Sequence, residues 1–81
     1  MRLDKYLKNS RLIKRRTVAK EACDEQRVSV NGKIAKPGTE LERGDIVHIE
    51  FGNSSITVEV VSLPETVRKE SAPDMYRIMN E

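Results

Sequence analysis

The sequence predicts an α+β fold in which two short N-terminal helices pack on a small antiparallel sheet of three to four strands. Apolar residues recur at helical spacing in the first third of the chain and then alternate with polar residues at strand spacing. Residue pairs typical of tight turns, led by Asn31-Gly32, separate the strand patterns. These observations indicate one small domain, because 81 residues can bury only one compact core.

Both helices are predicted from apolar side chains that fall on one face. In residues 3–9, three such residues lie at positions i, i+3 and i+4: Leu3, Tyr6 and Leu7. In residues 17–26, the apolar stripe consists of Val18, Ala19 and Ala22, with Cys23 at its margin. We expect Thr17 to cap this second helix, because its hydroxyl can accept a hydrogen bond from an unpaired amide of the first turn.

Residues 28–30, 46–51 and 56–60 alternate apolar and polar side chains, a pattern typical of strands with one buried face. Asn31-Gly32 predicts a hairpin after the first of them, because both residues tolerate positive φ. Pro64 ends the last strand, and we expect a domain over residues 1–63 followed by a linker and tail over residues 64–81. The apolar residues near the end of the tail could dock on the domain or on a partner.

Basic residues are concentrated in the first 36 residues. This part holds eleven Lys or Arg and four Asp or Glu, a formal charge of +7, whereas residues 37–81 carry −5 within a total of +2. Such asymmetry attracts polyanions to one end of a molecule, although a merely solvated charged face is the alternative. The basic side chains line the first helix, fill the segment that links it to the second helix, and extend onto the second helix: Arg2, Lys5, Lys8, Arg11, Lys14, Arg15, Arg16 and Lys20.

Few residues point to catalysis. His48 is the only histidine and has no Cys or carboxylate at metal-ligand spacing, and Cys23 lies beside an apolar stripe, where a packed thiol is expected. The four glycines are spaced as turns and form no phosphate-binding loop. We therefore expect a non-enzymatic protein without a catalytic residue, metal or cofactor.

The compartment is predicted from what the first residues and the cysteine count indicate. The chain starts without the apolar run of a signal peptide, and no segment is long and apolar enough to cross a bilayer. A single cysteine excludes an internal disulfide, which suits a reducing compartment. We expect a cytoplasmic protein with no membrane partner.

The basic helical surface favours binding of structured RNA through its shape and its phosphates. The three aromatic residues, Tyr6, Phe51 and Tyr76, do not indicate a platform on which bases stack. Two alternatives stay open. One is a helix-turn-helix DNA-binding regulator, which would need to dimerise, and the other is a protein-interaction module with an acidic partner.

Four segments, taken in order, carry a family likeness: RLDKYL at the start, RRTVAKEA on the second helix, RVSVNGK at the hairpin and ERGDIVHI on the next strand. Together they resemble the RNA-binding domain first known in ribosomal protein S-four, the alpha-L motif. The likeness covers residues 1–52, and the strand up to residue 63 is an addition to it. With the tail segment MYRIMNE, the chain is most similar to free-standing members of this family that act in ribosome-associated quality control.

This resemblance implies binding to rRNA and peptidyl-tRNA on obstructed large ribosomal subunits, in support of RqcH as it adds C-terminal alanine tails to stalled chains. We expect a monomer off the ribosome. The second possibility is the free-standing heat-shock protein with the same module, which acts in ribosome recycling. A long basic C-terminal extension would favour that type, whereas residues 64–81 hold three basic and four acidic residues.

The family places its RNA surface on the two helices and the adjoining hairpin, so the resemblance makes Arg2 and Arg16 the first expected RNA contacts. Asp4 is next: it would orient one of these arginines or accept a hydrogen bond from a base or ribose, unless it only favours the first turn of the helix.

Two residues depart from the family. Gln26 replaces a frequent glycine at the end of the second helix, at a cost of about 1 kcal/mol if the left-handed geometry is kept. Arg15 replaces a capping serine.

Overall fold

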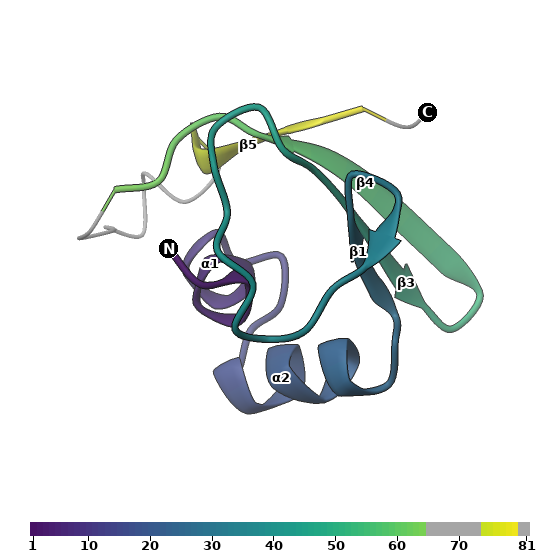
Figure 1. Ribbon diagram of the computed structural model, residues 1–81. Helices are drawn as coiled ribbons and strands as arrows, with labels where there is room; N and C mark the ends of the chain where they lie inside the picture. The colour runs from purple at the N-terminus through teal and green to yellow at the C-terminus, as the bar shows by residue number, and fades with distance from the viewer. Residues whose placement is uncertain (65–73, 80–81) are drawn as a thin grey trace.

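In the computed structural model, two helices cover one face of an antiparallel sheet (Figure 1). The structure describes residues 1–64 and 74–79. Its elements are α1 (Leu3–Asn9), α2 (Arg16–Asp24), β1 (Val28–Val30), β2 (Lys33–Ile34), β3 (Ile46–Phe51), β4 (Ser54–Val60) and β5 (Tyr76–Ile78). The strand order is β2-β1-β3-β4-β5, so β2 and β5 form the edges. The predicted α+β class is confirmed, with five strands in the sheet rather than three to four.

Each helix buries a stripe of side chains against the sheet. α1 buries the residues predicted from its spacing: Leu3, Tyr6 and Leu7. α2 is buried through Ala19 and Cys23, which lie one turn apart. Val18 is 45% exposed, so its predicted place in the buried stripe is wrong. The stripe runs through Ala19 and Cys23, and Val18 lies to one side of it on the helix surface.

The start of α2 also differs from the prediction. The helix begins at Arg16, which places Thr17 inside it, and the N-cap residue is Arg15 in an extended conformation. Arg15 makes no side-chain cap hydrogen bond. The predicted capping role of Thr17 is therefore wrong, because the helix begins one residue earlier than the apolar pattern indicates.

The end of α2 has the left-handed geometry that glycine favours. Gln26 has a φ of 62°. Its amide donates to the Cys23 carbonyl at 3.0 Å, and the Arg27 amide donates to the Ala22 carbonyl at 2.9 Å. These two bonds are those of a Schellman motif, which satisfies carbonyls at the helix end. The left-handed helix end that the resemblance implies is therefore kept, and Gln26 bears the cost of a side chain at positive φ.

The predicted hairpin is confirmed between β1 and β2. Asn31 and Gly32 have φ angles of 52° and 85°, as a type I′ turn requires. The Asn31 side chain also accepts a hydrogen bond from the Ile46 amide at 2.9 Å and donates one to Asp45 Oδ1 at 3.1 Å. These bonds hold the turn at the start of β3. All three residues of β1 pair with β3.

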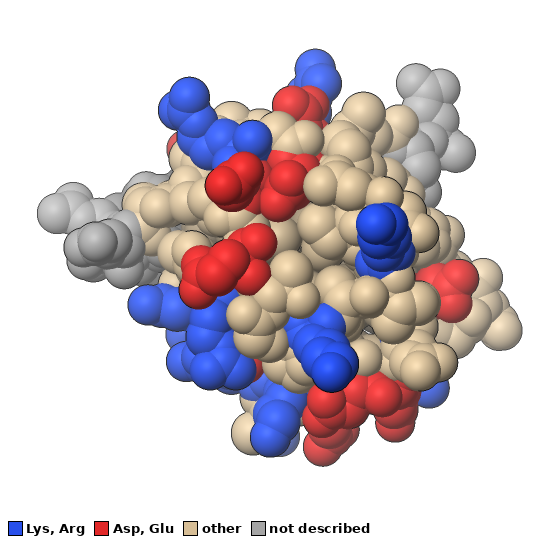
Figure 2. Space-filling view, in the orientation of Figure 1, with Lys and Arg blue, Asp and Glu red and all other residues tan. Residues whose placement is uncertain are grey.

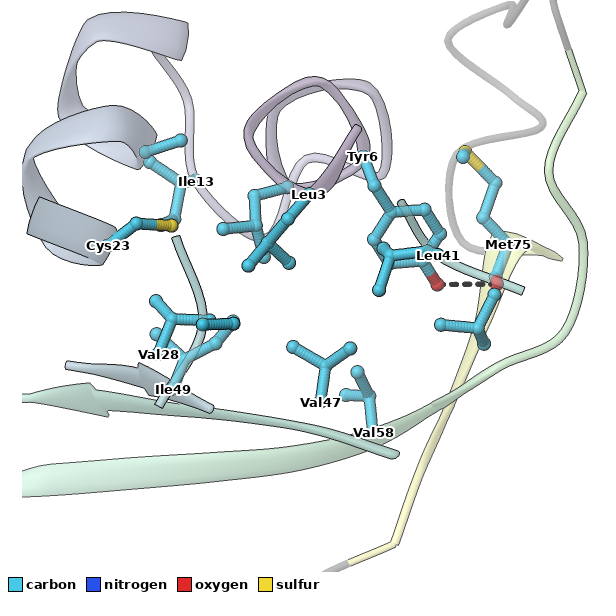
Figure 3. Close-up of a cluster of buried hydrophobic side chains, with 14 residues drawn as sticks. Leu3, Tyr6, Ile13, Cys23, Val28, Leu41, Val47, Ile49, Val58 and Met75 are labelled. Carbon is cyan, nitrogen blue, oxygen red and sulfur yellow. Dashed lines mark hydrogen bonds between the residues drawn. The ribbon is translucent and has the colours of Figure 1, made fainter. Parts of the chain in front are cut away.

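The end of the predicted tail docks on the domain. β5 pairs with β4, with Tyr76 opposite Val60 and Ile78 opposite Val58. The Tyr6 hydroxyl donates a hydrogen bond of 2.7 Å to the carbonyl of Met75, and both side chains are fully buried (Figure 3). Burial, with Tyr76 nearby, raises the pKa of Tyr6 above its ordinary value. Residues 65–73 of the predicted linker lie outside the described residues.

The core lies between the helices and the sheet. In Figure 3, side chains from the helical layer point toward those of the strands below, and the labelled residues are Leu3, Tyr6, Ile13, Cys23, Val28, Leu41, Val47, Ile49, Val58 and Met75. Alternation along β3 buries Val47 and Ile49 against the helices and turns His48 to the opposite face. The helices therefore keep their outer surfaces free for charged residues.

Candidate nucleic-acid interface

All eight basic residues predicted to form the binding surface are exposed. Four lie on α1 or next to it, three in the link or at its end, and Lys20 lies one turn after Arg16 on α2. We call this surface the basic helical face: Arg2, Lys5, Lys8, Arg11, Lys14, Arg15, Arg16 and Lys20. Basic side chains gather at the lower left of Figure 2, over the region where Figure 1 shows α1 and the start of α2.

Asp4 joins the two helices within this face. Its side chain is only 5% exposed, and its carboxylate forms ion pairs with two arginines. Oδ1 lies 3.4 Å from Arg2 Nε, and Oδ2 lies 3.5 Å from Arg16 Nε. The backbone amide of Lys5 donates to Oδ1 at 2.8 Å, which fixes the rotamer of the carboxylate. A single buried acid therefore holds arginines from the starts of both helices.

The two arginines keep part of their hydrogen-bonding capacity for a ligand. Each side chain is 50% exposed. Arg2 Nε lies 3.4 Å from Asp4 Oδ1, and Arg2 Nη2 lies 3.5 Å from Asp4 Oδ2. A guanidinium carries five N–H donors, so the outer edge of Arg2 can still donate to a phosphate. Holding the guanidinium in place before binding lowers the entropy lost when a phosphate is bound.

The start of the chain is held by the loop between β2 and β3. The Leu3 amide donates to the Thr39 carbonyl at 2.8 Å, and the Asp4 amide donates to the Pro37 carbonyl at 3.1 Å. On the far side of Arg2, the Leu41 amide donates to the Met1 carbonyl at 3.0 Å. Because these contacts span more than 30 positions, no local pattern in the sequence could have revealed them.

The remaining basic residues surround this ion-paired centre. Lys5 and Lys8 lie on the exposed side of α1, and Lys14 and Arg15 lie in the link. Arg11 has a φ of 66°, and its amide donates to the Lys8 carbonyl at 3.0 Å where α1 ends. Within residues 1–64 and 74–79, the ion pairs of the basic helical face are those of Arg2 and Arg16 with Asp4. The other six side chains thus present their charge to solvent.

The residues considered for catalysis occupy structural positions. Cys23 is buried, and burial, together with Asp4 and Asp24, raises the pKa of its thiol to about 11. The thiol is therefore protonated at neutral pH. His48 Nδ1 lies 2.8 Å from Thr57 Oγ1 on the outer face of the sheet. In the part of the chain that the structure describes, no three His, Cys, Asp or Glu residues come together as a metal site.

Among the residues that the structure describes, no helix is long and apolar enough to span a bilayer.

Comparison with known proteins agrees with this architecture. The model of the S4 domain family matches residues 1–47. The "RQC P-site tRNA stabilizing factor" of Halalkalibacterium halodurans is 54% identical over 81 residues, which cover 100% of this chain and 92% of that protein. The "Heat shock protein 15 homolog" of Aeromonas salmonicida is 33% identical over 73 residues, covering 90% of this chain and 54% of that protein. The trimeric structure of Vibrio cholerae heat shock protein 15 has a TM-score of 0.89 at 29% identity, covering 98% of this chain and 81% of that one.

Proposed function

This chain belongs to the S4 domain family, and from that premise we propose that it is an RNA-binding protein of ribosome-associated quality control. In this proposal it binds rRNA and the P-site peptidyl-tRNA on obstructed large ribosomal subunits and stabilises that tRNA. It thereby supports RqcH as it adds alanine tails to stalled chains. The role is that of a cytoplasmic, non-enzymatic binding protein, monomeric off the ribosome. The similarity over the whole chain to a factor named for P-site tRNA stabilisation supports this choice among RNA-binding roles.

The observation that carries the proposal is the arginine pair held by Asp4. Two half-exposed guanidiniums on different helices, fixed by one buried carboxylate, are arranged to grip phosphates of a folded RNA. The surrounding lysines and arginines supply mobile positive charge at the rim of this centre. We propose Arg2 and Arg16 as the principal RNA contacts and Lys5, Lys8, Arg11, Lys14, Arg15 and Lys20 as supporting contacts, with Asp4 acting by orienting the arginines.

The test measures how fast peptidyl-tRNA is lost from isolated obstructed large subunits. Wild-type protein should slow this loss, and Arg2→Ala/Arg16→Ala should not, because each lost charge-assisted contact costs about 1–3 kcal/mol of binding. Arg43→Ala/Arg77→Ala is the matched control: it also removes two positive charges, but outside the basic helical face. Equal protection by all three proteins would contradict the proposed role of the arginine pair.

A second candidate is the recycling role of the heat-shock type, which the TM-score of 0.89 to heat shock protein 15 favours. Two observations rank it lower. The identity to the heat shock protein 15 homolog is 33%, against 54% to the tRNA-stabilising factor, and the chain spans about half of that homolog. A reaction with RqcH, obstructed subunits and alanyl-tRNA separates the two roles. Longer alanine tails in the presence of the protein would support the first, and faster release of the tRNA the second.

Binding to a protein rather than to RNA is a further alternative, because an acidic partner could also meet the basic helical face. Salt weakens both kinds of complex and does not separate them. Ribonuclease treatment of the complex does: release of the protein supports RNA binding, and retention supports a protein partner.

A further inference from the structure

The turn between β1 and β2 carries a chemical reactivity that the proposed function does not use. Asn31 is the only asparagine of the sequence that is followed by glycine, and both residues of this pair are exposed. The backbone nitrogen of the residue after an asparagine can attack the side-chain amide, and a glycine at that position has no side chain to hinder the attack. Asparagine is for such reactions a thermolabile residue. Asn31 is therefore the asparagine of this chain that is chemically most open to loss of its amide.

The folded hairpin restrains the Asn31 side chain at both of its polar atoms. Oδ1 accepts a hydrogen bond from the Ile46 amide at 2.9 Å, and Nδ2 donates one to Asp45 Oδ1 at 3.1 Å. Asp45 is fixed in turn, because its Oδ2 accepts from the Glu42 amide at 2.9 Å. Ring closure would also require the Gly32 nitrogen and the Asn31 Cβ to eclipse each other across the Cα–C bond. A type I′ turn, with a ψ of about +30° at its first central residue, sets them far from that rotation.

From these contacts we propose that Asn31 is a deamidation site that the folded hairpin protects and that becomes reactive when the hairpin opens. In the open chain, the Gly32 nitrogen forms a bond to Asn31 Cγ, and its proton passes to the side-chain nitrogen, which leaves as ammonia. The product is a five-membered succinimide. Water then adds to either carbonyl of the ring and breaks the adjacent bond to nitrogen, which gives aspartate or isoaspartate. The sequence of steps consumes water and releases ammonia, with no oxidation or reduction.

The product does not fit the turn. An aspartate at this position can still accept from the Ile46 amide, but its second oxygen replaces the nitrogen that donates to Asp45 Oδ1. Two carboxylates then meet where a hydrogen bond joined the turn to the start of β3, and like charges at that distance repel each other. Deamidation therefore loosens the β1–β2 hairpin and leaves a lasting mark on chains that have been unfolded.

The rate of the reaction in folded and unfolded protein tests the protection. The full-length wild type is incubated at one mildly alkaline pH, with and without guanidinium chloride, and mass spectrometry follows the peptide that holds Asn31. We expect deamidation in denaturant and a rate lower by about tenfold or more in the folded protein, because two hydrogen bonds must break before the attack. Asn53 is exposed and is followed by Ser54, so it serves as the internal control and should react more slowly in denaturant. Equal rates at Asn31 in the two conditions, or no reaction in denaturant, would overturn the inference.

Substitutions test the effect of the product on the hairpin. Asn31→Asp should lower the melting temperature by roughly 4–8 °C. In Asn31→Asp/Asp45→Asn the donor and the acceptor are exchanged, since the new asparagine can accept from the Glu42 amide and donate to the new carboxylate. This double variant should recover most of the loss. A wild-type melting temperature of Asn31→Asp, or a double variant no more stable than Asn31→Asp, would overturn the proposed damage to the hairpin.

Discussion

Replacing Asp4 with asparagine keeps the size of the side chain and removes its charge from the centre of the basic helical face. In the structure, the Asp4 carboxylate lies within 3.5 Å of nitrogens from both Arg2 and Arg16 and accepts a hydrogen bond from the Lys5 amide. An asparagine oxygen can still accept from Lys5, but its amide group cannot attract both guanidiniums. We therefore expect Asp4→Asn to release the two arginines while keeping the fold.

Two opposing effects decide how RNA binding changes. Removing a negative charge makes the face more positive, which strengthens binding by at most about 1 kcal/mol for a charge near 4 Å in water and less after screening by salt. Releasing two arginines costs about 0.5–1.5 kcal/mol for each side chain that must be ordered again on binding. The second effect is the larger one, so we expect the affinity to fall by about 1 kcal/mol, or roughly fivefold. Stability should fall by about 1–2 kcal/mol, less than for a fully buried pair because both arginines are half-exposed.

The assay compares Asp4→Asn with Asp24→Asn by urea unfolding and by affinity for large ribosomal subunits. Asp24 lies exposed near the end of α2, so its replacement adds the same positive charge without touching the arginines. Asp24→Asn should bind RNA as tightly as the wild type or slightly tighter, and Asp4→Asn more weakly. If both variants gain affinity by the same amount, Asp4 contributes charge alone, and its role in orienting Arg2 and Arg16 is refuted.

Three further predictions concern stability. Gln26→Gly should raise it by about 1 kcal/mol, because the residue lies at positive φ in the Schellman motif, and the melting temperature should rise by roughly 4–8 °C; an unchanged melting temperature would contradict this reasoning. Leu7→Ala should lose about 2–5 kcal/mol in denaturant unfolding, since Leu7 is fully buried, and a loss below about 1 kcal/mol would show that it is not a core residue. The pKa of Cys23 is raised from 9.0 to about 11, so its contribution to stability is complete below pH 9 and is lost as the pH rises to about 11. Cys23→Ala should show a shallower decline in unfolding free energy over that interval, and an identical decline would remove Cys23 as its cause.

The elements that the sequence predicted well are those encoded by local spacing. The i, i+3, i+4 pattern identified the buried face of α1, and Asn31-Gly32 identified the hairpin, because each depends on residues close together in the chain. β5 was not predicted as a strand, since its stability comes from pairing with β4 and from the hydrogen bond between Tyr6 and the Met75 carbonyl, and both depend on residues far away in the chain.

For the candidate site, the sequence predicted which residues carry the positive charge, but not how their side chains are arranged. Exposure of Lys5 and Lys8 follows from their position opposite the apolar stripe of α1, and Lys14 and Arg15 lie in the polar segment between the helices. The resemblance implied that Asp4 orients Arg2 or Arg16. The structure shows it between both, because the packing of α1 on α2 brings the two helix starts together. The start of α1 is held by backbone hydrogen bonds to Pro37 and Thr39, which are distant in the sequence and meet it only in the folded chain.

The measurement that tests the central claim most directly is cosedimentation of the tagged protein with separated ribosomal subunits from lysate. The wild type and Arg2→Ala/Arg16→Ala are compared on the same gradients. We expect the wild type to travel with the large subunit and the double variant to stay at the top, still folded although less stable because buried Asp4 loses both partners. If the wild type also stays at the top at low salt with stalled complexes present, the basic helical face does not bind the ribosome, and the proposed function is wrong.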